Sequence, residues 1–211
     1  MSGLFITFEG TEGGGKSTQI AKLGEKLAGL NFKVLSLREP GGTPIGEEIR
    51  HTLKHSASNH AMTAEAELFL MNASRAQLVR EVIRPALAKG EVVLCDRFFD
   101  STIAYQGYGR QLDLSRVRNV IQFAIGETVP NRTILLRVPI QVSEERRAAR
   151  GTVERDRFEE ADREFFRRVE QGYDAIARAE PQRVKVIDAT RTIDEVAANI
   201  WREIEPMLGV R

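Results

Sequence analysis

The feature that most constrains the fold is a glycine-rich segment close to the start of the chain. Residues 10–17 read Gly-Thr-Glu-Gly-Gly-Gly-Lys-Ser and match the pattern G-x-x-x-x-G-K-[ST]. At average residue usage, such a match arises by chance about 1% of the time in a chain of this length. The apolar run Leu4–Phe8 precedes the segment and a helical pattern follows it, which is the setting that a phosphate-binding loop requires. The segment lacks the G-x-G-x-x-G of dinucleotide-binding loops, which excludes that type of loop. The match and its setting between a strand and a helix predict an α/β fold that binds nucleotide phosphates.

The residue types of this loop suit phosphate binding. Glycines let backbone N–H groups converge on phosphate oxygens, and the N-terminus of the following helix adds a favourable dipole. Lys16 is expected to reach the β- and γ-phosphates, and Ser17 is expected to ligate Mg²⁺. The loop residues predicted to bind ATP are Gly10, Thr11, Glu12, Gly13, Gly14, Gly15, Lys16, Ser17 and Thr18.

Strand-like and helix-like segments alternate along the chain. Further apolar runs of strand length lie at 34–37, 92–95, 133–138 and 184–187. Helical spacing of apolar residues occurs at about 20–30, 64–88, 114–126, 142–150, 159–178 and 193–208. Pro85 predicts a kink or an early stop in the second of these helices. The alternation predicts a parallel sheet with right-handed crossovers, and the absence of repeats and linkers predicts a single domain over residues 1–211.

Composition excludes several classes of protein. Lys and Arg number 31 against 30 Asp and Glu, so the net charge of +1 provides no field to hold a polyanion, and no nucleic-acid partner is expected. Cys95 is the single cysteine, which excludes an internal disulfide and a cysteine-rich zinc site. His51 and His55 have i, i+4 spacing without an evident third ligand, so a metal site there is not expected. No apolar run approaches the ~20 residues of a membrane span, and no signal peptide is evident, so we expect a cytoplasmic protein without a membrane partner.

Polar residues after the second and third predicted strands indicate a second binding site. Residues 38–43 read R-E-P-G-G-T, and Asp96-Arg97-Phe98 ends the third strand. Loops at the carboxyl ends of parallel strands are where α/β proteins bind ligands. Asp96 fits a metal-organising position, and Arg97 could hold a substrate phosphate or, alternatively, form a structural ion pair. No N/T-K-x-D segment for guanine occurs, which favours ATP over GTP.

Together these segments resemble the thymidylate kinases of bacteria. The resemblance covers essentially the full length and rests on G-T-E-G-G-G-K-S-T, R-E-P-G-G-T, A-S-R-A-Q-L-V, D-R-F, S-T-I-A-Y-Q-G and D-R-F-E. It implies a P-loop NTPase-type, five-stranded parallel sheet flanked by helices, in the three-layer nucleoside monophosphate kinase architecture with a lid. It also implies phosphorylation of dTMP to dTDP with ATP and Mg²⁺, usually by a homodimer.

The resemblance assigns expected roles at the sugar and phosphate of dTMP. Glu12 matches an acid that contacts the 3′-hydroxyl, and Arg97 matches the arginine that holds the acceptor phosphate. Arg50 resembles a second phosphate or loop contact. Tyr105 resembles a tyrosine packed under the deoxyribose, where it would crowd a 2′-hydroxyl.

At the base, Arg75 matches an arginine that approaches thymine, while Thr102 and Gln106 resemble the polar pair near the pyrimidine edge. The family usually stacks a phenylalanine on thymine four residues before that arginine, and Met71 stands there in this chain. Methionine packs against rings through its polarizable sulfur but is less rigid than phenylalanine. We therefore expect a looser thymine pocket.

Residues of about 146–158 resemble the lid that closes over ATP. One branch of the family carries an arginine in the phosphate loop where this chain has Gly13, so the lid is expected to supply the charge. Arg147, Arg150 and Arg155 are the candidates, with Arg150 preferred. The predicted catalytic residues are Lys16, Arg97 and Arg150, and the predicted metal-binding residues are Ser17 and Asp96.

Three alternative functions share parts of this pattern. A kinase of a different nucleoside or nucleotide would differ around Met71, Arg75 and Tyr105. A regulatory module would bind ATP and transfer nothing, and a nucleic-acid-binding ATPase is disfavoured by the balanced charge. The helical pattern at 64–88 could carry a dimer interface, although a helix buried within the domain would show the same pattern.

Overall fold

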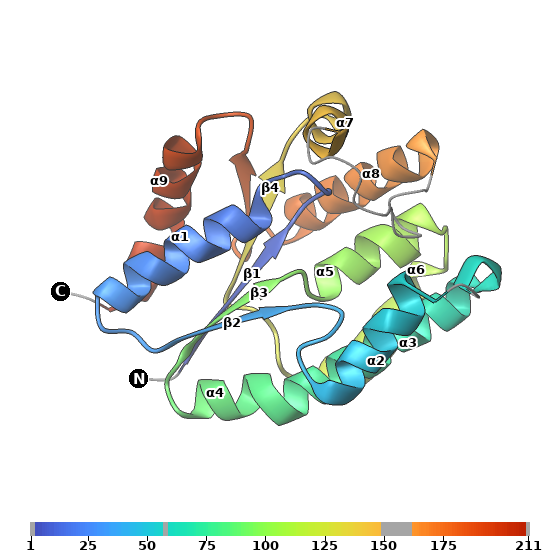
Figure 1. Cartoon of the computed structure of the whole chain (residues 1–211), viewed down its shortest axis with the longest axis horizontal. Helices are drawn as coiled ribbons and strands as arrows, with labels where there is room; N and C mark the ends of the chain where they lie inside the picture. The colour runs from blue at the N-terminus through green and yellow to red at the C-terminus, as the bar shows by residue number, and fades with distance from the viewer. Residues whose placement is uncertain (1–2, 57–58, 149–161, 210–211) are drawn as a thin grey trace.

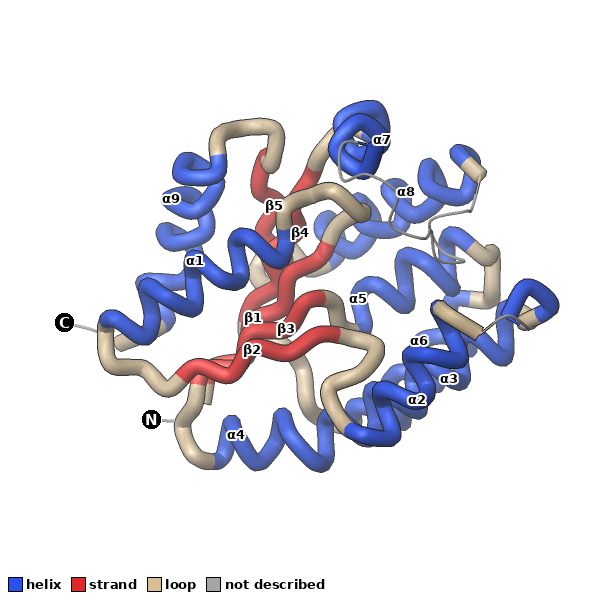
Figure 2. The backbone as a smooth tube through the Cα atoms, in the orientation of Figure 1, coloured by secondary structure: helices blue, strands red, loops and turns tan. Residues whose placement is uncertain are grey.

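A computed structural model describes residues 3–56, 59–148 and 162–209, without the side chains of residues 60, 147 and 148. Its centre is a five-stranded sheet of order β2-β3-β1-β4-β5 in which all neighbouring strands are parallel (Figures 1 and 2). The strands are β1 (Leu4–Glu9), β2 (Val34–Arg38), β3 (Val92–Asp96), β4 (Arg132–Arg137) and β5 (Val184–Asp188). The five apolar runs predicted from the sequence therefore all form strands, and the predicted parallel sheet is confirmed.

Helices cover both faces of the sheet, which explains why β1 and β3 lack alternation of apolar and polar side chains. In β1, Phe5 contacts one layer of helices, and Ile6 and Phe8 contact the other layer. All three side chains are 0% exposed. Cys95 of β3 is also fully buried, as a small apolar side chain in the sheet should be.

Two helices, α1 (Lys16–Gly29) and α9 (Ile193–Ile204), lie on one face of the sheet, on the left in Figure 1. Their buried side chains, among them Leu23 and Ile200, pack with Ile6 in what we call the α1/α9-side cluster. A capping box between Thr192 and Glu195 fixes the start of α9.

The opposite face packs against a larger group of helices. They are α3 (Ala64–Leu78), α4 (Arg84–Ala88), α5 (Phe99–Thr102), α6 (Leu114–Ile125) and α8 (Arg163–Ala179). Their buried side chains, among them Leu78, Val117 and Val169, pack with Phe5 in what we call the α3/α8-side cluster. Side-chain oxygens of Thr63, Asp113 and Asp162 accept backbone hydrogen bonds at the starts of α3, α6 and α8.

The predicted helix at 64–88 is one continuous helical rod with a wider turn inside it. Between α3 and α4 the segment Val79–Ile83 is π-helical, and Pro85 follows at once in the first turn of α4. Proline lacks the N–H that an α-helix would use and its ring needs room next to the preceding turn. The widened turn thus accommodates Pro85 without ending the rod.

The helical stretches that the sequence analysis missed include residues 44–54 and residues 99–109. Residues 44–54 form α2 (Pro44–Lys54), which begins with proline in its first turn and is capped by the Thr43 side chain. After α5, residues Ile103–Gly109 form a second π-helical segment. Both lie beside the candidate site described below.

The predicted helices at 142–150 and 159–178 correspond to α7 (Ile140–Ala148) and α8. Most of the predicted lid, including Arg150 and Arg155, falls outside the described residues, as does the side chain of Arg147. Within the described ranges, no helix is both long and apolar enough to cross a membrane.

Candidate functional site

Two adjoining cavities lie where the loops after β1, β2 and β3 meet. The polar one, called here the phosphate cavity, is lined by Glu12, Gly13, Gly15, Lys16, Ser17, Arg38, Glu39, Arg50, Lys54, Asp96 and Arg97. The other, called here the base cavity, is lined by Glu12, Glu39, Pro40, Lys54, Met71, Arg75, Arg97, Ser101, Thr102, Tyr105 and Gln106. Glu12, Glu39, Lys54 and Arg97 belong to both. The arrangement therefore suits a ligand with phosphates at one end and a ring at the other.

The phosphate loop connects β1 directly to α1. Gly10 has φ +128° and an added Cβ would lie 2.3 Å from the carbonyl oxygen of Leu136, so only glycine fits there. Lys16 Nζ donates to the carbonyl oxygens of Gly10 and Thr11 at 3.2 and 3.0 Å. Burial, with the nearby Arg97 charge, lowers the pKa of Lys16. The lysine is thus held inside the loop, next to where phosphate oxygens would bind.

Ser17 and Asp96 lie together at the edge of the phosphate cavity. The hydroxyl of Ser17 donates to Oδ2 of Asp96 at 3.2 Å. Both supply the hard oxygen ligands that Mg²⁺ prefers, and Mg²⁺ usually uses one or two such protein groups with substrate phosphates and water completing its shell. The pair therefore fits Mg²⁺ bound to ATP. No cluster of three or more His, Cys, Asp or Glu side chains suited to a metal occurs in the described part of the chain.

Arg97 is one of the four side chains that line both cavities, and the only arginine among them. Its backbone has φ +69°, an uncommon conformation for a residue other than glycine. Its Nη2 donates to Glu12 Oε1 at 2.7 Å and to the Tyr105 hydroxyl at 3.2 Å. Its Nη1 donates to Ser101 Oγ at 3.0 Å and to the Tyr173 hydroxyl at 3.3 Å. Four partners, of which Glu12 and Tyr173 are distant in sequence, thus fix one guanidinium at the junction.

The carboxylates around Arg97 have opposite pKa shifts. Burial alone would raise the pKa of Glu12, but the charges of Arg97 and Lys16 outweigh it and hold that pKa well below its ordinary value. Burial and the charge of Asp100 raise the pKa of Glu9 to about 6. Glu12 therefore stays ionised next to Arg97.

Glu9, Ser101 and Tyr173 form a buried network that the sequence analysis did not predict. Glu9 Oε2 accepts hydrogen bonds from Ser101 Oγ at 2.5 Å and from the Tyr173 hydroxyl at 2.9 Å. Glu9 Oε1 accepts from the backbone N–H of Phe98 at 2.8 Å. The network ties β1 and α8 to the loop that presents Arg97. Glu9 ends a strand, as Asp96 does, and Ser101 begins the S-T-I-A-Y-Q-G segment, but no local pattern marks Tyr173 or links the three residues.

At the base cavity, Arg75 is 2% exposed and uses its N–H donors on the protein itself. Nε and Nη2 contact Oε2 of Glu39 at 2.7 and 2.6 Å. Nη1 donates to Asn72 Oδ1 at 3.0 Å and to Thr102 Oγ1 at 2.9 Å, and Nη2 also donates to the carbonyl oxygen of Phe98. Arg75 therefore lines the cavity as the centre of a hydrogen-bond network.

Glu39 pairs with Arg75 but is only half satisfied. Its Oε1 is buried without a hydrogen-bond partner among the described residues. Burial raises the pKa of Glu39 to about 7, against the lowering effect of Arg75. A buried carboxylate oxygen without a partner, in a residue that lines both cavities, is available to a ligand.

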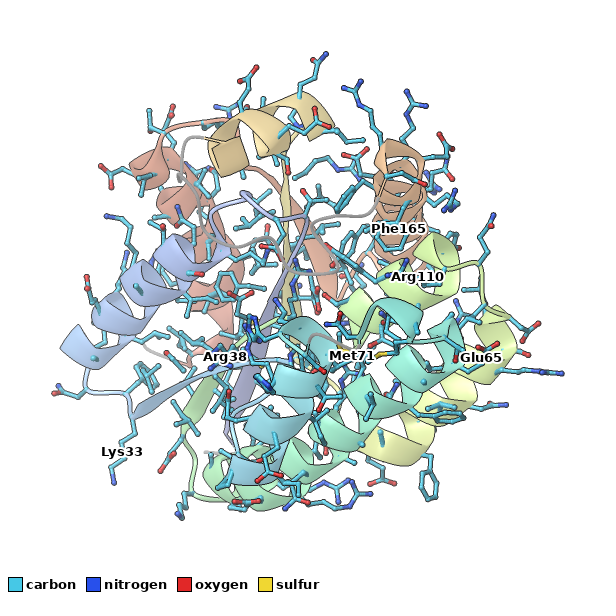
Figure 3. All side chains as sticks on the ribbon, turned by 45° about the vertical axis from the view of Figure 1, so that its right-hand side comes forward. Lys33, Arg38, Glu65, Met71, Arg110 and Phe165 are labelled. Carbon is cyan, nitrogen blue, oxygen red and sulfur yellow. The ribbon has the colours of Figure 1, made fainter. Side chains whose placement is uncertain are left out.

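The remaining predicted residues are distributed as follows. Met71, Thr102, Tyr105 and Gln106 line the base cavity together, and Figure 3 labels Met71 on α3. Arg50 lines the phosphate cavity, where its Nη1 donates to the carbonyl oxygen of Pro40 at 2.9 Å.

Some of the residues predicted to bind ATP line neither of these two cavities. Thr18 is exposed on α1 and lines neither cavity, and Gly14 likewise lines neither. Lys54, at the end of the unpredicted helix α2, lines both cavities and was missed because its segment lacked a motif.

The helix α7 lies against the phosphate loop. Ser143 Oγ donates to the carbonyl oxygen of Glu12 at 2.5 Å. Arg146 donates to the carbonyl oxygens of Gly13 at 3.4 Å and Ala189 at 3.0 Å. Ser143 and Arg146 therefore hold α7 against the phosphate loop at Glu12 and Gly13.

Comparisons with known proteins find relatives that are similar in sequence and in fold. The family model described as "Thymidylate kinase" matches residues 8–200. A thymidylate kinase of Syntrophotalea carbinolica is 48% identical over 94% of this chain and 93% of its own length. One of Deinococcus radiodurans is 48% identical over 96% of both chains. The crystal structure of thymidylate kinase from Ehrlichia chaffeensis matches with a TM-score of 0.79 and 32% identity, covering 96% of this chain and 98% of that one.

Proposed function

The chain belongs to the thymidylate kinase family, and from this premise we propose that it transfers the γ-phosphoryl group of ATP to the 5′-phosphate of dTMP, giving dTDP. The observation that carries the assignment is the junction of the two cavities at Arg97. One cavity is built from the phosphate loop and the other has an apolar wall with a few polar groups. This is the arrangement needed to place a donor and an acceptor phosphate next to each other.

The phosphate cavity is proposed to bind the ATP phosphates. Loops of this kind bind phosphate oxygens through backbone N–H groups, and Lys16 is proposed to add a positive charge near the β- and γ-phosphates. Ser17 and Asp96 are proposed to hold Mg²⁺ together with ATP oxygens. When bound, Mg²⁺ neutralises part of the charge on the donor phosphates.

Arg97 is proposed to hold the acceptor phosphate. Its guanidinium is fixed by Ser101, Tyr105 and Tyr173, so its orientation needs little reorganisation when a phosphate arrives. Glu12, now paired with Arg97, is proposed to accept a hydrogen bond from the 3′-hydroxyl of the sugar.

The reaction needs no covalent enzyme intermediate. The acceptor phosphate oxygen attacks the γ-phosphorus in line, the bond to the β-γ bridging oxygen breaks, and ADP leaves. Lys16 and Arg97, which line the same cavity, are both proposed to stabilise the charge that develops on the transferred group. The protein thus contributes position and electrostatics rather than a nucleophile.

The base cavity is proposed to bind thymine. Met71, Tyr105, Thr102 and Gln106 line it, and we propose that Tyr105 lies beside the sugar while Gln106 and Thr102 supply polar contacts to the base. Arg75 is proposed to act at the base through this network, because the hydrogen bonds described above engage its guanidinium.

The lid is proposed to supply further charge to the ATP phosphates from Arg147, Arg150 or Arg155. Support comes from Arg146, the first residue of the predicted lid, which donates to the carbonyl oxygen of Gly13 in the phosphate loop. Closure would also exclude water from the transfer.

A homodimer is proposed from two exposed aromatic side chains. Phe69 on α3 is 60% exposed and Phe123 on α6 is 88% exposed, and α3 and α6 pack against each other. Large apolar side chains exposed on adjacent helices favour a protein partner. Sedimentation equilibrium of the wild type and of Phe123→Lys tests this, since the variant should be monomeric. A cytoplasmic location, where dTMP and ATP occur, is part of the proposal.

The decisive experiment measures ADP production from ATP and Mg²⁺ with dTMP, dUMP, dCMP, dGMP, AMP and thymidine in turn. We expect strong turnover with dTMP. Turnover with thymidine alone would move the acceptor from phosphate to hydroxyl and contradict the role of Arg97. ATP binding without any acceptor turnover would contradict the kinase assignment.

A further inference from the structure

The side chain of Gln106 has a single defined orientation in the base cavity. It is 1% exposed and lies in the π-helical segment that follows α5. Its Nε2 donates to Oε1 of Glu67 at 2.7 Å. A side-chain amide carries its donor and its acceptor on opposite arms, so Oε1 of Gln106 is left as an acceptor. Within the described residues no hydrogen bond uses this oxygen, and it is not among the atoms sealed away from solvent.

Glu67 determines this orientation. It is 0% exposed on α3, and Arg110 donates to its two oxygens from Nε at 3.3 Å and from Nη2 at 3.1 Å. Arg110 in turn lies over the ring of Phe165, 4.7 Å from its centre, and both are labelled in Figure 3. A carboxylate paired with a guanidinium accepts hydrogen bonds and donates none. If the Gln106 amide were reversed, its oxygen would lie about where Nε2 lies now, 2.7 Å from Oε1 of Glu67, and the two oxygens would repel each other. Only the orientation with Nε2 toward Glu67 is therefore favourable.

The neighbouring donors in the cavity are already engaged. The contacts of Arg75 with Glu39, Asn72, Thr102 and Phe98 occupy its guanidinium. The side-chain carbonyl oxygen of Gln106, by contrast, has no hydrogen-bond partner among the described residues. It therefore remains available as an acceptor for a base that enters the cavity.

We propose that Glu67 is a positioning residue for base selection, because it holds the Gln106 amide so that a carbonyl oxygen faces N3 of the bound pyrimidine. This inference rests on the proposed function, which places a pyrimidine nucleotide in the base cavity. Thymine carries a hydrogen on N3 and donates it to such an oxygen. Cytosine has a bare N3 lone pair, which the same oxygen repels. Uracil also carries the N3 hydrogen, so this device distinguishes thymine from cytosine and does not distinguish thymine from uracil.

The test replaces Glu67 with glutamine, which is nearly the same shape. In Glu67→Gln the new amide can present either an oxygen or an NH₂ group to Gln106, so both orientations of Gln106 become accessible. Glu65→Gln is the matched control, since Glu65 makes the same change two residues away at an exposed position of α3 (Figure 3). For each protein, kcat and KM are measured with dTMP, dUMP and dCMP, and dissociation constants for the three nucleotides are measured by calorimetry.

We expect the preference for dTMP over dCMP to fall by about tenfold or more in Glu67→Gln. The reason is that the charged carboxylate that holds the Gln106 amide in one orientation is replaced by a neutral amide. The change should appear in KM and in the dissociation constants. The ratio of dTMP to dUMP should stay the same, and Glu65→Gln should match the wild type. A general loosening of the cavity would change the dTMP to dUMP ratio as well, and that result would overturn the proposal. An unchanged dTMP to dCMP preference would overturn it too.

Two further measurements distinguish a failure of this inference from a failure of the proposed function and from misfolding of the variant. Wild-type turnover with dTMP is measured first, and its absence would contradict the proposed function itself. If Glu67→Gln does not fold, a neutron crystal structure of the wild-type protein locates the deuterium atoms on Gln106. Deuterium on the arm facing Glu67 supports the proposal, and deuterium on the arm facing the cavity overturns it.

Discussion

Removing the hydroxyl of Tyr173 tests the network that supports Arg97. Tyr173 is 3% exposed on α8, and its hydroxyl contacts Glu9 Oε2 at 2.9 Å, Ser101 Oγ at 3.0 Å and Arg97 Nη1 at 3.3 Å. In Tyr173→Phe the ring packing is kept and only these contacts are lost. The change therefore isolates the hydrogen bonds of a residue far from the phosphate loop in sequence.

The expected loss of stability in Tyr173→Phe follows from the charges of Glu9 and Arg97, which are hydrogen-bond partners of the hydroxyl. A hydrogen bond to a charged group contributes about 1.5–3 kcal/mol, and Glu9 would keep only Ser101 on its Oε2. We expect a loss of about 2 kcal/mol in the free energy of unfolding at pH 8, where Glu9 is ionised. At roughly 2–4 °C per kcal/mol for a chain of this size, the Tm should fall by about 4–8 °C. Arg97 keeps its contacts with Glu12, Ser101 and Tyr105, so kcat/KM for dTMP should fall only about fivefold.

Tyr108→Phe is the matched control. Tyr108 is a partly buried tyrosine of the π-helical segment that packs against the same core, and its hydroxyl makes no hydrogen bond with described residues. Urea unfolding and dTMP kinetics of both variants provide the comparison. If Tyr173→Phe were no less stable than Tyr108→Phe, the network would not stabilise the site, and the reasoning would be wrong.

Three further changes give direct outcomes. Arg97→Ala should lower kcat by at least about 100-fold while circular dichroism shows an intact fold, and normal kcat at saturating substrates would contradict its role. Met71→Phe should lower the KM for dTMP about fivefold, because a stacked ring adds about 1 kcal/mol, and an unchanged KM would show that residue 71 does not face the base. Because burial raises the pKa of Glu39 to about 7, the folded protein holds a proton that the unfolded chain releases above about 4.5, so stability should decrease as pH rises from 4.5 through 7. Glu39→Gln should remove about 3 kcal/mol of this decrease in urea titrations at pH 5 and pH 8, and an identical pH dependence in both proteins would refute the shift.

The sheet and the phosphate loop could be predicted because their signals are local. A strand covered on both faces is a short apolar run, and Leu4, Phe5 and Ile6 form such a run without reference to any distant residue. The loop is predicted by eight consecutive residues whose spacing is set by phosphate chemistry. The second helix was missed although Thr43 and Pro44 form a good helix start.

The parts of the site that were missed depend on contacts between distant residues. Tyr173 meets Glu9 across 164 positions, and nothing in the sequence around either residue marks the pair. Glu67 looks like one of several acids at the start of a helix until the fold brings Gln106 and Arg110 to it. Family resemblance supplied Arg75 as a base contact, while its hydrogen-bond partners follow only from the three-dimensional arrangement.

The two hydrophobic clusters on either side of the sheet differ in whether their side chains line the cavities. No buried side chain of the α1/α9-side cluster, such as Leu23 or Ile200, lines either cavity. Tyr105 belongs to the α3/α8-side cluster and forms a wall of the base cavity, with Met71 packed beside that cluster. Mutations on the first side can therefore accumulate and change thermal tolerance without altering which nucleotide is accepted. A new substrate preference has to arise on the other side, where each change in the pocket is also a change in the core.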